Sequence, residues 1–165
     1  MQNNTSSVTP KAFLRTFTMI HLFLVAGVLI FGLMIFFLTE NHQLTFNYTG
    51  DVMFFIVPFM GIAGILIGNY LYANTLKGLA SKNTLREKLT GFQTASIIKY
   101  ALLEGPAFLG IISFMNDGNQ YFLIIAILLV GWLIAQRPTK DKVERDLLLK
   151  GSLKQEFQQE DRPLA

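Results

Sequence analysis

The chain has 165 residues, of which 52% are apolar and only 15% are charged. Because a soluble domain carries about 25% charged residues, this composition disfavours the soluble classes and indicates a small membrane protein. The absence of cysteine excludes disulfides, thiolate metal ligands and cysteine catalysis. With only two histidines, His21 and His42, we expect neither a metal site nor a cofactor.

Four apolar stretches follow one another along the chain, and we predict that each is a transmembrane helix. A helix needs about 20 apolar residues to cross the hydrocarbon of a bilayer. The predicted spans are residues 17–38, 52–72, 94–115 and 120–136. The fourth is short, so we expect it to include the polar residues at its ends or to tilt less than its neighbours.

Two other interpretations of the apolar stretches are disfavoured. The helices of a soluble bundle would carry a polar stripe, which residues 22–38 lack. A signal peptide would have a shorter apolar core and a cleavage site with small residues, whereas the first span is long and residues 36–40 offer no such site. We therefore expect the first span to remain part of the protein.

The basic residues predict the orientation in the membrane. All 14 Lys and Arg except Lys99 lie before the first span, between the second and third, or after the fourth. The other two loops, 40–51 and 116–120, contain neither residue type. By the positive-inside rule, both termini are then cytoplasmic. We attribute the net charge of +3 to this orientation and to anionic lipids, and expect no nucleic-acid partner.

The expected fold is all-α, an integral membrane four-helix bundle over residues 17–136 that follows a flexible cytoplasmic segment at residues 1–16. Residues 137–165 form the predicted cytoplasmic tail. Within the tail, Pro138 marks a helix boundary, and the pattern of residues 139–150 predicts a short amphipathic helix. That helix is either a solvated segment touching the inner leaflet or a docking site for a partner.

A carboxylate, Glu104, lies near the middle of the third span, where an ionised acid costs roughly 2.5 to 3.5 kcal/mol. In the predicted orientation His21, Asn69 and Lys99 lie within roughly 5 to 10 Å of the inner boundary, at the helical rise per residue. Glu104 is about 7 or 8 Å deeper than Lys99. We therefore predict a polar cluster of these four residues in the inner half of the bundle.

Three roles for Glu104 remain open at this point. It is a protonated acid hydrogen-bonded across a helix interface, a proton- or cation-handling group, or a contact with a partner subunit. Lys99 is five residues away and about 140° around the helix, so an intrahelical pair is not expected. Lys99 either extends to the inner interface or acts as a counter-ion, and His21 is either a polar interface residue or a proton relay.

Small residues and one proline predict how the helices pack. A four-residue spacing that lets helices approach closely occurs in the second and third spans. The four-residue pairs are Gly64 with Gly68 and Ala101 with Gly105, and Gly61 lies on the same face of its helix as Gly64 and Gly68. They are either contacts within the bundle or the seam of a homo-oligomer. Pro106 cannot donate to the carbonyl four residues before it, so we expect a kink that leaves this carbonyl free.

Two segments carry a resemblance to known proteins. Lys99-Tyr-Ala-Leu-Leu-Glu-Gly-Pro-Ala107 and Arg137-Pro-Thr-Lys-Asp-Lys142, together with the four-span spacing, resemble a group of small uncharacterised bacterial membrane proteins. The resemblance covers most of the chain and implies the four-span architecture. It implies no activity.

A second resemblance covers residues 61–110, which are similar to the helical hairpin of the proteolipid c subunits of rotary ATP synthases. It is carried by a glycine-bearing helix, a polar cytoplasmic loop and the segment Ala101-Leu-Leu-Glu104, with Gly110 beyond it. The resemblance implies that Glu104 carries a proton or sodium ion and that the glycines of the second span line a ring. The loop lacks the family's Arg-Gln-Pro signature, and the first and fourth spans have no place in a two-helix ring.

The sequence contains no recognisable catalytic site, because a lone carboxylate lacks a nucleophile and an orienting partner. We therefore predict a non-enzymatic accessory, assembly or interaction component of the inner membrane. The alternative is a proton- or ion-handling channel, carrier or proteolipid-like subunit that uses Glu104. The expected partners are the lipid bilayer and either further copies of the chain or another subunit of a membrane complex.

Overall fold

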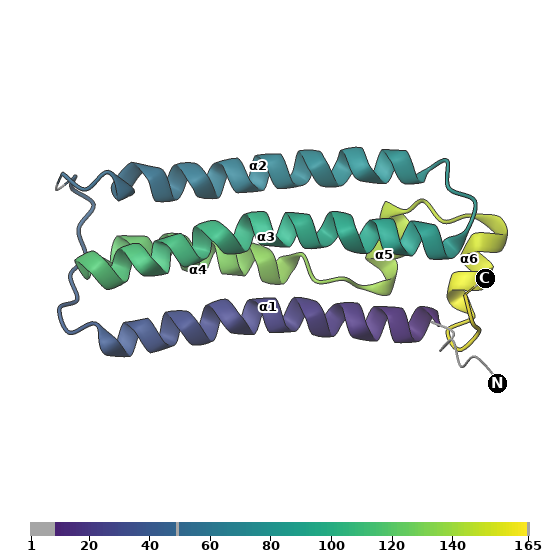
Figure 1. Cartoon of the computed structure of the whole chain (residues 1–165), viewed down its shortest axis with the longest axis horizontal. Coiled ribbons are helices and arrows are strands. Elements are labelled where there is room, and N and C mark those ends of the chain that lie inside the picture. Colours follow the sequence, from purple (N-terminus) through teal and green to yellow (C-terminus); the bar gives the residue numbers. More distant parts are fainter. Residues whose placement is uncertain (1–8, 49, 165) are drawn as a thin grey trace, which may run out of the picture.

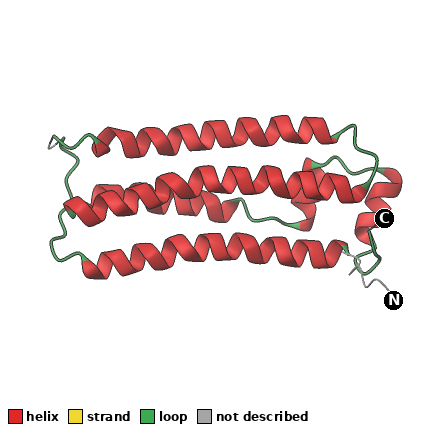
Figure 2. Ribbon diagram, viewed as in Figure 1, coloured by secondary structure: helices red, strands yellow, loops and turns green. Residues whose placement is uncertain are grey.

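The protein is described by a computed structural model over residues 9–48 and 50–164. Its helices are α1 (Pro10–Leu38), α2 (Met53–Leu79), α3 (Leu85–Asp117), α4 (Gln120–Ala135), α5 (Lys140–Asp146) and α6 (Gly151–Gln158). Figure 2 shows no strand in this part of the chain. The all-helical prediction is confirmed for these residues. We predicted a flexible segment at residues 1–16. Residues 1–8 lie outside the described residues, and residues 10–16 are part of helix α1.

Short polar residues fix the starts of the helices, because a side-chain oxygen can accept from an otherwise unpaired N–H of the first turn. Thr9 accepts from the N–H of Ala12 at the start of α1. Thr84 accepts from the N–H of Glu87 at 3.3 Å, and its own hydroxyl donates to the Glu87 carboxylate at 3.0 Å. α3 ends at Asp117 and is capped by Gly118, whose φ of 68° is the left-handed conformation that glycine adopts without strain.

The third helix is the centre of the bundle. In Figure 1, α2 and α1 lie on opposite sides of α3, and α4 lies against α3 along its other face. α4 is much shorter than its neighbours, and the chain continues past its end to α5 and α6. We call the end that carries α5, α6 and the start of α1 the tail end, and the opposite end, with residues 39–52, the loop end.

The loop end is closed by hydrogen bonds between the 39–52 segment and the turn from α3 to α4. The N–H of Gln43 donates to the carbonyl of Gly118 at 3.0 Å, and the N–H of Gln120 donates to the carbonyl of Gln43 at 2.8 Å. The side chain of Asn119, which is buried, donates to the carbonyl of Thr45 at 3.1 Å. These bonds attach the first connection of the chain to the turn that follows the central helix.

Three helices, α1, α2 and α3, are each long and apolar enough to cross a membrane. α4 qualifies only together with α5, across a bend of 80°, so the fold holds three candidate spans, or four if that bent pair is counted. Large apolar side chains cover the outward faces, for example Phe23 at 71% and Phe59 at 70% exposed. Apolar surface of this extent is consistent with a membrane protein, whose outer faces meet lipid.

Gly64 marks the closest approach between α2 and α3. A Cβ at Gly64 would overlap the backbone carbonyl oxygen of Leu102, and the ring of Pro106 lies next to it. Because Pro106 has no N–H, this is the carbonyl that loses its helical partner. The glycine therefore lets α2 pack directly on the part of α3 that the proline leaves open. α3 is not interrupted at Pro106 and continues to Asp117.

The other small residues divide between two environments. Gly61 packs against Leu129 of α4, and Gly68 packs against the aliphatic stem of Lys99. These two glycines, like Gly64, are buried inside the bundle. Ala101 and Gly105 instead lie on the exposed side of α3, and nothing lies within 4 Å of a Cβ placed on Gly105.

The tail differs from the single amphipathic helix predicted for residues 139–150. α5 ends at Asp146, and after a short connection that includes Leu148 at a φ of 50°, a second helix begins at Gly151. Gly151 has a φ of 54°, which glycine tolerates. Phe157 of α6 is fully buried, so the second helix is anchored to the bundle.

Candidate functional site

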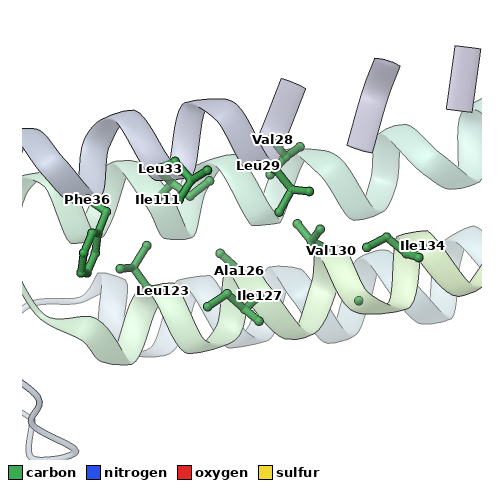
Figure 3. A pocket seen from close by; sticks show the side chains of 12 residues that line it. Val28, Leu29, Leu33, Phe36, Ile111, Leu123, Ala126, Ile127, Val130 and Ile134 are labelled. Carbon is green, nitrogen blue, oxygen red and sulfur yellow. The ribbon is translucent and has the colours of Figure 1, made fainter. Parts of the chain in front are cut away.

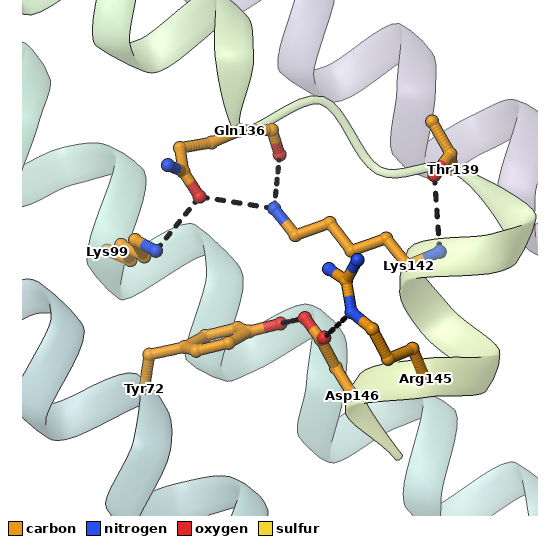
Figure 4. Close-up of polar contacts among 7 residues, drawn as sticks. All are labelled: Tyr72, Lys99, Gln136, Thr139, Lys142, Arg145 and Asp146. Atoms are coloured by element: carbon orange, nitrogen blue, oxygen red, sulfur yellow. Dashed lines mark hydrogen bonds and ion pairs between the residues drawn. The ribbon is translucent and has the colours of Figure 1, made fainter. Parts of the chain in front are cut away.

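Gln136 is the centre of a polar cluster at the tail end. The Lys99 ammonium donates to its side-chain oxygen, Oε1, at 2.9 Å, and the Lys142 ammonium donates to the same oxygen at 3.2 Å. Lys142 also donates to the Gln136 backbone carbonyl at 2.9 Å, as does the Tyr100 hydroxyl. Figure 4 shows the two lysines approaching Gln136 from α3 and from α5.

The local fold explains why these donors gather at Gln136. α4 ends at Ala135, and the last carbonyls of a helix have no intrahelical partner. Pro138 then prevents the helix from continuing, and Thr139 starts α5 by accepting from the N–H of Lys142 at 3.2 Å. The reversal places Lys142 beside the end of α4, where its ammonium satisfies a free carbonyl.

A second set of contacts connects α2 to α5. The Tyr72 hydroxyl donates to the Asp146 carboxylate at 2.7 Å, and Arg145 pairs with the other oxygen of that carboxylate at 3.0 Å. The Lys99 ammonium lies 4.9 Å from the centre of the Tyr72 ring, within range of a cation–π interaction. Figure 4 shows Tyr72, Asp146 and Arg145 in this arrangement. The cluster therefore joins α2, α3, α4 and α5.

The cluster carries an excess of positive charge. Lys99 is 8% exposed, and neither it nor Lys142 forms an ion pair with a carboxylate among residues 9–48 and 50–164. Both oxygens of Asp146 are engaged by Tyr72 and Arg145. Burial, followed by the nearby charge of Lys99, lowers the pKa of Lys142 to about 8.

His21 lies beside this cluster but does not join its hydrogen bonds. Its Nε2 donates to the carbonyl of Leu133 in α4 at 2.9 Å, and Nδ1 has no hydrogen-bond partner in the described part of the chain. The imidazole is buried, and its ring centre is 4.9 Å from that of Tyr100. His21 thus connects α1 to the last turn of α4.

The structure separates the four residues predicted to form one cluster. Lys99 and His21 lie inside the bundle near the end of α4, whereas Asn69 is on the exposed side of α2. Glu104 is half-buried and forms no hydrogen bond or ion pair with any residue that the structure describes. It lies within about 60° of the exposed Ala101 on the helix surface, at the edge of the outward face.

Sequence reasoning missed most members of the cluster, namely Tyr72, Tyr100, Gln136, Lys142 and Asp146. The pattern of residues 139–150 predicts a helix that is either solvated or a docking site for a partner, and it does not indicate contacts between that helix and the spans. One signal was available: Arg137-Pro138 ends α4 abruptly, and free carbonyls at such an end attract donors. Which donors reach them depends on the direction of α5, which the sequence pattern does not specify.

A groove of about 360 Å³ lies between α1 and α4, with Ile111 of α3 at its base (Figure 3). Its walls include Leu29, Leu33 and Phe36 of α1 and Ala126, Ile127 and Val130 of α4. The lining side chains are all apolar, so the groove suits hydrocarbon and offers no hydrogen bond to a hydrophilic solute. Metal-binding geometry is also lacking, since no three His, Asp or Glu residues gather anywhere in the described ranges.

Comparison with known proteins gives no family assignment. No protein-family model matches this chain, and no curated protein or solved structure is significantly similar to it. The resemblances to small bacterial membrane proteins and to the proteolipid hairpin therefore stay predictions.

Proposed function

We propose that this chain is a multi-pass protein of a bacterial inner membrane, with four spans and both termini in the cytoplasm. Three helices long enough to span, α1, α2 and α3, support this topology. The fourth span is α4, which passes the same test only together with α5, and the distribution of Lys and Arg gives the orientation. The tail end of the bundle, with its lysines, is then the cytoplasmic end.

Within that membrane we propose a non-enzymatic assembly or interaction component that contacts a partner helix through α3. The contact surface, which we call the Glu104 face, consists of Ala101, Glu104 and Gly105. One observation carries the proposal: Glu104 lies half-buried at the edge of an outward surface, without a hydrogen bond or ion pair in the described chain. A carboxyl in that position is costly in hydrocarbon, and a partner helix removes the cost by hydrogen bonding to it.

The two small residues make close approach possible. Ala101 and Gly105 are exposed and four residues apart, the spacing at which a second helix packs closely. Gly105 has open space where a side chain would be, whereas Gly61, Gly64 and Gly68 of α2 are already packed inside the bundle. The exposed surface of α3 thus combines a polar group with the steric room that helix association in membranes requires.

Cysteine cross-linking tests the Glu104 face directly, because the chain contains no cysteine of its own. Ala101→Cys and Gly105→Cys would be expressed singly in bacterial membranes and oxidised or treated with a thiol cross-linker. We expect an adduct, either with a second copy or with a membrane partner, and we expect Glu104→Ala to weaken it. Gly27→Cys is the matched control, since Gly27 is also exposed with open space. Equal adducts at Gly27 and Gly105, or none at either Ala101 or Gly105, would refute the proposal.

The second candidate function is proton or ion handling by Glu104. It is favoured by the same unpaired, partly outward position, since a carboxyl that exchanges protons with a neighbouring subunit must be reachable from outside the bundle. The test is proton or sodium flux in proteoliposomes for the wild type and Glu104→Gln, with labelling by dicyclohexylcarbodiimide. Flux that is absent, or unchanged in Glu104→Gln, would eliminate this candidate and leave the first.

A further inference from the structure

Lys99 and Lys142 form a cationic pair that plays no part in the contact proposed at the Glu104 face. Two ammonium groups, one of them on a side chain that is only 8% exposed, converge on a single neutral oxygen, Gln136 Oε1. Buried like charges repel, and a buried cation ordinarily has a counter-ion or a full set of acceptors. Here the shared acceptor is an uncharged amide.

The nearby acids are already committed to other partners. Asp146 accepts from Tyr72 through one oxygen and pairs with Arg145 through the other. Glu144 pairs with Lys154 at 3.2 Å. Counted over Lys99, Lys142, Arg145 and Asp146, the cluster has three positive charges against one negative charge. Each lysine retains donors that the hydrogen bonds above do not use, because an ammonium has three.

We propose that Lys99 and Lys142 together bind one phosphate-type anion, and that the Gln136 side-chain oxygen occupies the position that an oxygen of this anion takes when it is bound. The chemistry is that of two charge-assisted hydrogen bonds to one phosphate group. The phosphate is either the headgroup of an anionic lipid in the leaflet at the tail end or a free phosphate ion.

The position of the pair suits a headgroup. Gln136 directly follows the last residue of α4, and Lys142 is on the first helix beyond it, so the pair lies where the apolar part of the fourth stretch ends. Gln136 and Lys142 are partly exposed, which leaves a route to the anion from outside. Anionic headgroups attract basic residues at this level of a bilayer. The free-phosphate form of the proposal does not depend on membrane topology or on the Glu104 face.

The experiment compares the full-length protein in three settings: nanodiscs of phosphatidylcholine, nanodiscs that also contain phosphatidylglycerol, and phosphatidylcholine nanodiscs with inorganic phosphate at matched ionic strength. The readout is the thermal unfolding midpoint, since a ligand that binds only the folded state raises it. A rise with phosphatidylglycerol alone identifies a lipid headgroup, and a rise with inorganic phosphate identifies a free ion. No rise in either setting would overturn the proposal.

Single substitutions locate the effect. Lys99→Met and Lys142→Met should each weaken the apparent affinity by about tenfold or more, the effect of losing one hydrogen bond to a charged group. Lys77→Met is the matched control, because it removes the same charge from an exposed position at the same end of the bundle. If Lys77→Met weakens the apparent affinity as much as Lys99→Met and Lys142→Met do, the anion responds only to the net positive charge of this end of the bundle. That result would overturn the proposed site.

Gln136→Glu tests the proposal without removing a lysine. It places a carboxylate where the anion's oxygen is expected, so the unfolding midpoint in phosphatidylcholine should rise and the further rise with the anion should disappear. A Gln136→Glu variant that still gains the full anion-dependent rise would refute the shared site, even if Lys99→Met failed to fold.

Discussion

Gly64→Ala tests the closest packing contact in the bundle. The new methyl group would overlap the backbone carbonyl oxygen of Leu102, and a backbone atom inside a helix cannot move aside as a flexible side chain can. α2 and α3 must therefore separate, which costs about 1 to 3 kcal/mol, the usual effect of overpacking. The gain in helix propensity from glycine to alanine, up to about 1 kcal/mol, offsets only part of this.

The matched control is Gly27→Ala on α1. No atom lies within 4 Å of the Cβ that this substitution adds, so only the propensity term remains and the variant should be as stable as the wild type or slightly more stable. Equilibrium unfolding of both variants in mixed micelles of a mild detergent and dodecyl sulfate measures the difference. If Gly64→Ala is as stable as Gly27→Ala, the close contact between Gly64 and the carbonyl freed by Pro106 is not a determinant of the fold.

Three further predictions concern the tail end and the start of α3. The pKa of Lys142 is about 8 in the folded protein, below its ordinary value of 10.5, so between these pH values the unfolded chain binds more protons than the folded one. The free energy of unfolding should therefore rise with pH in this range. Unfolding curves recorded at several pH values should show a smaller rise for Lys142→Met. Tyr72→Phe removes the hydrogen bond to the Asp146 carboxylate and should cost about 1.5 to 3 kcal/mol, with faster amide exchange in α5; unchanged exchange would argue against this connection. Thr84→Ala removes the cap of α3 and should cost about 0.5 to 2 kcal/mol, whereas Thr84→Ser should keep most of the stability.

The sequence predicted the helices well because hydrophobic length and capping residues are local properties. The predicted third span, 94–115, lies within α3, and the predicted fourth span differs from α4 by one residue at its end. α1 and α2 extend beyond their spans at the tail end, since helices continue into the polar boundary as long as no breaker stops them.

The candidate site was less predictable, because it depends on which faces of the helices meet. Depth along the membrane normal can be counted from residue numbers, and on that basis Asn69 and Glu104 were grouped with Lys99 and His21. Rotation about each helix axis is decided by packing, and it turns Asn69 outward and leaves Glu104 at an edge. Contacts that depend on the reversal after Pro138, such as that between Lys142 and Gln136, have no signal in sequence periodicity.

The most direct test of the central claim is cross-linking of Gly105→Cys in native membranes, with and without Glu104→Ala in the same chain. The account predicts a defined adduct for Gly105→Cys that is reduced severalfold by Glu104→Ala, because the carboxyl needs a hydrogen-bond partner that a neighbouring helix supplies. An adduct that is indifferent to Glu104→Ala, or a Gly105→Cys protein that stays uncross-linked like Gly27→Cys, would contradict an interaction surface on α3.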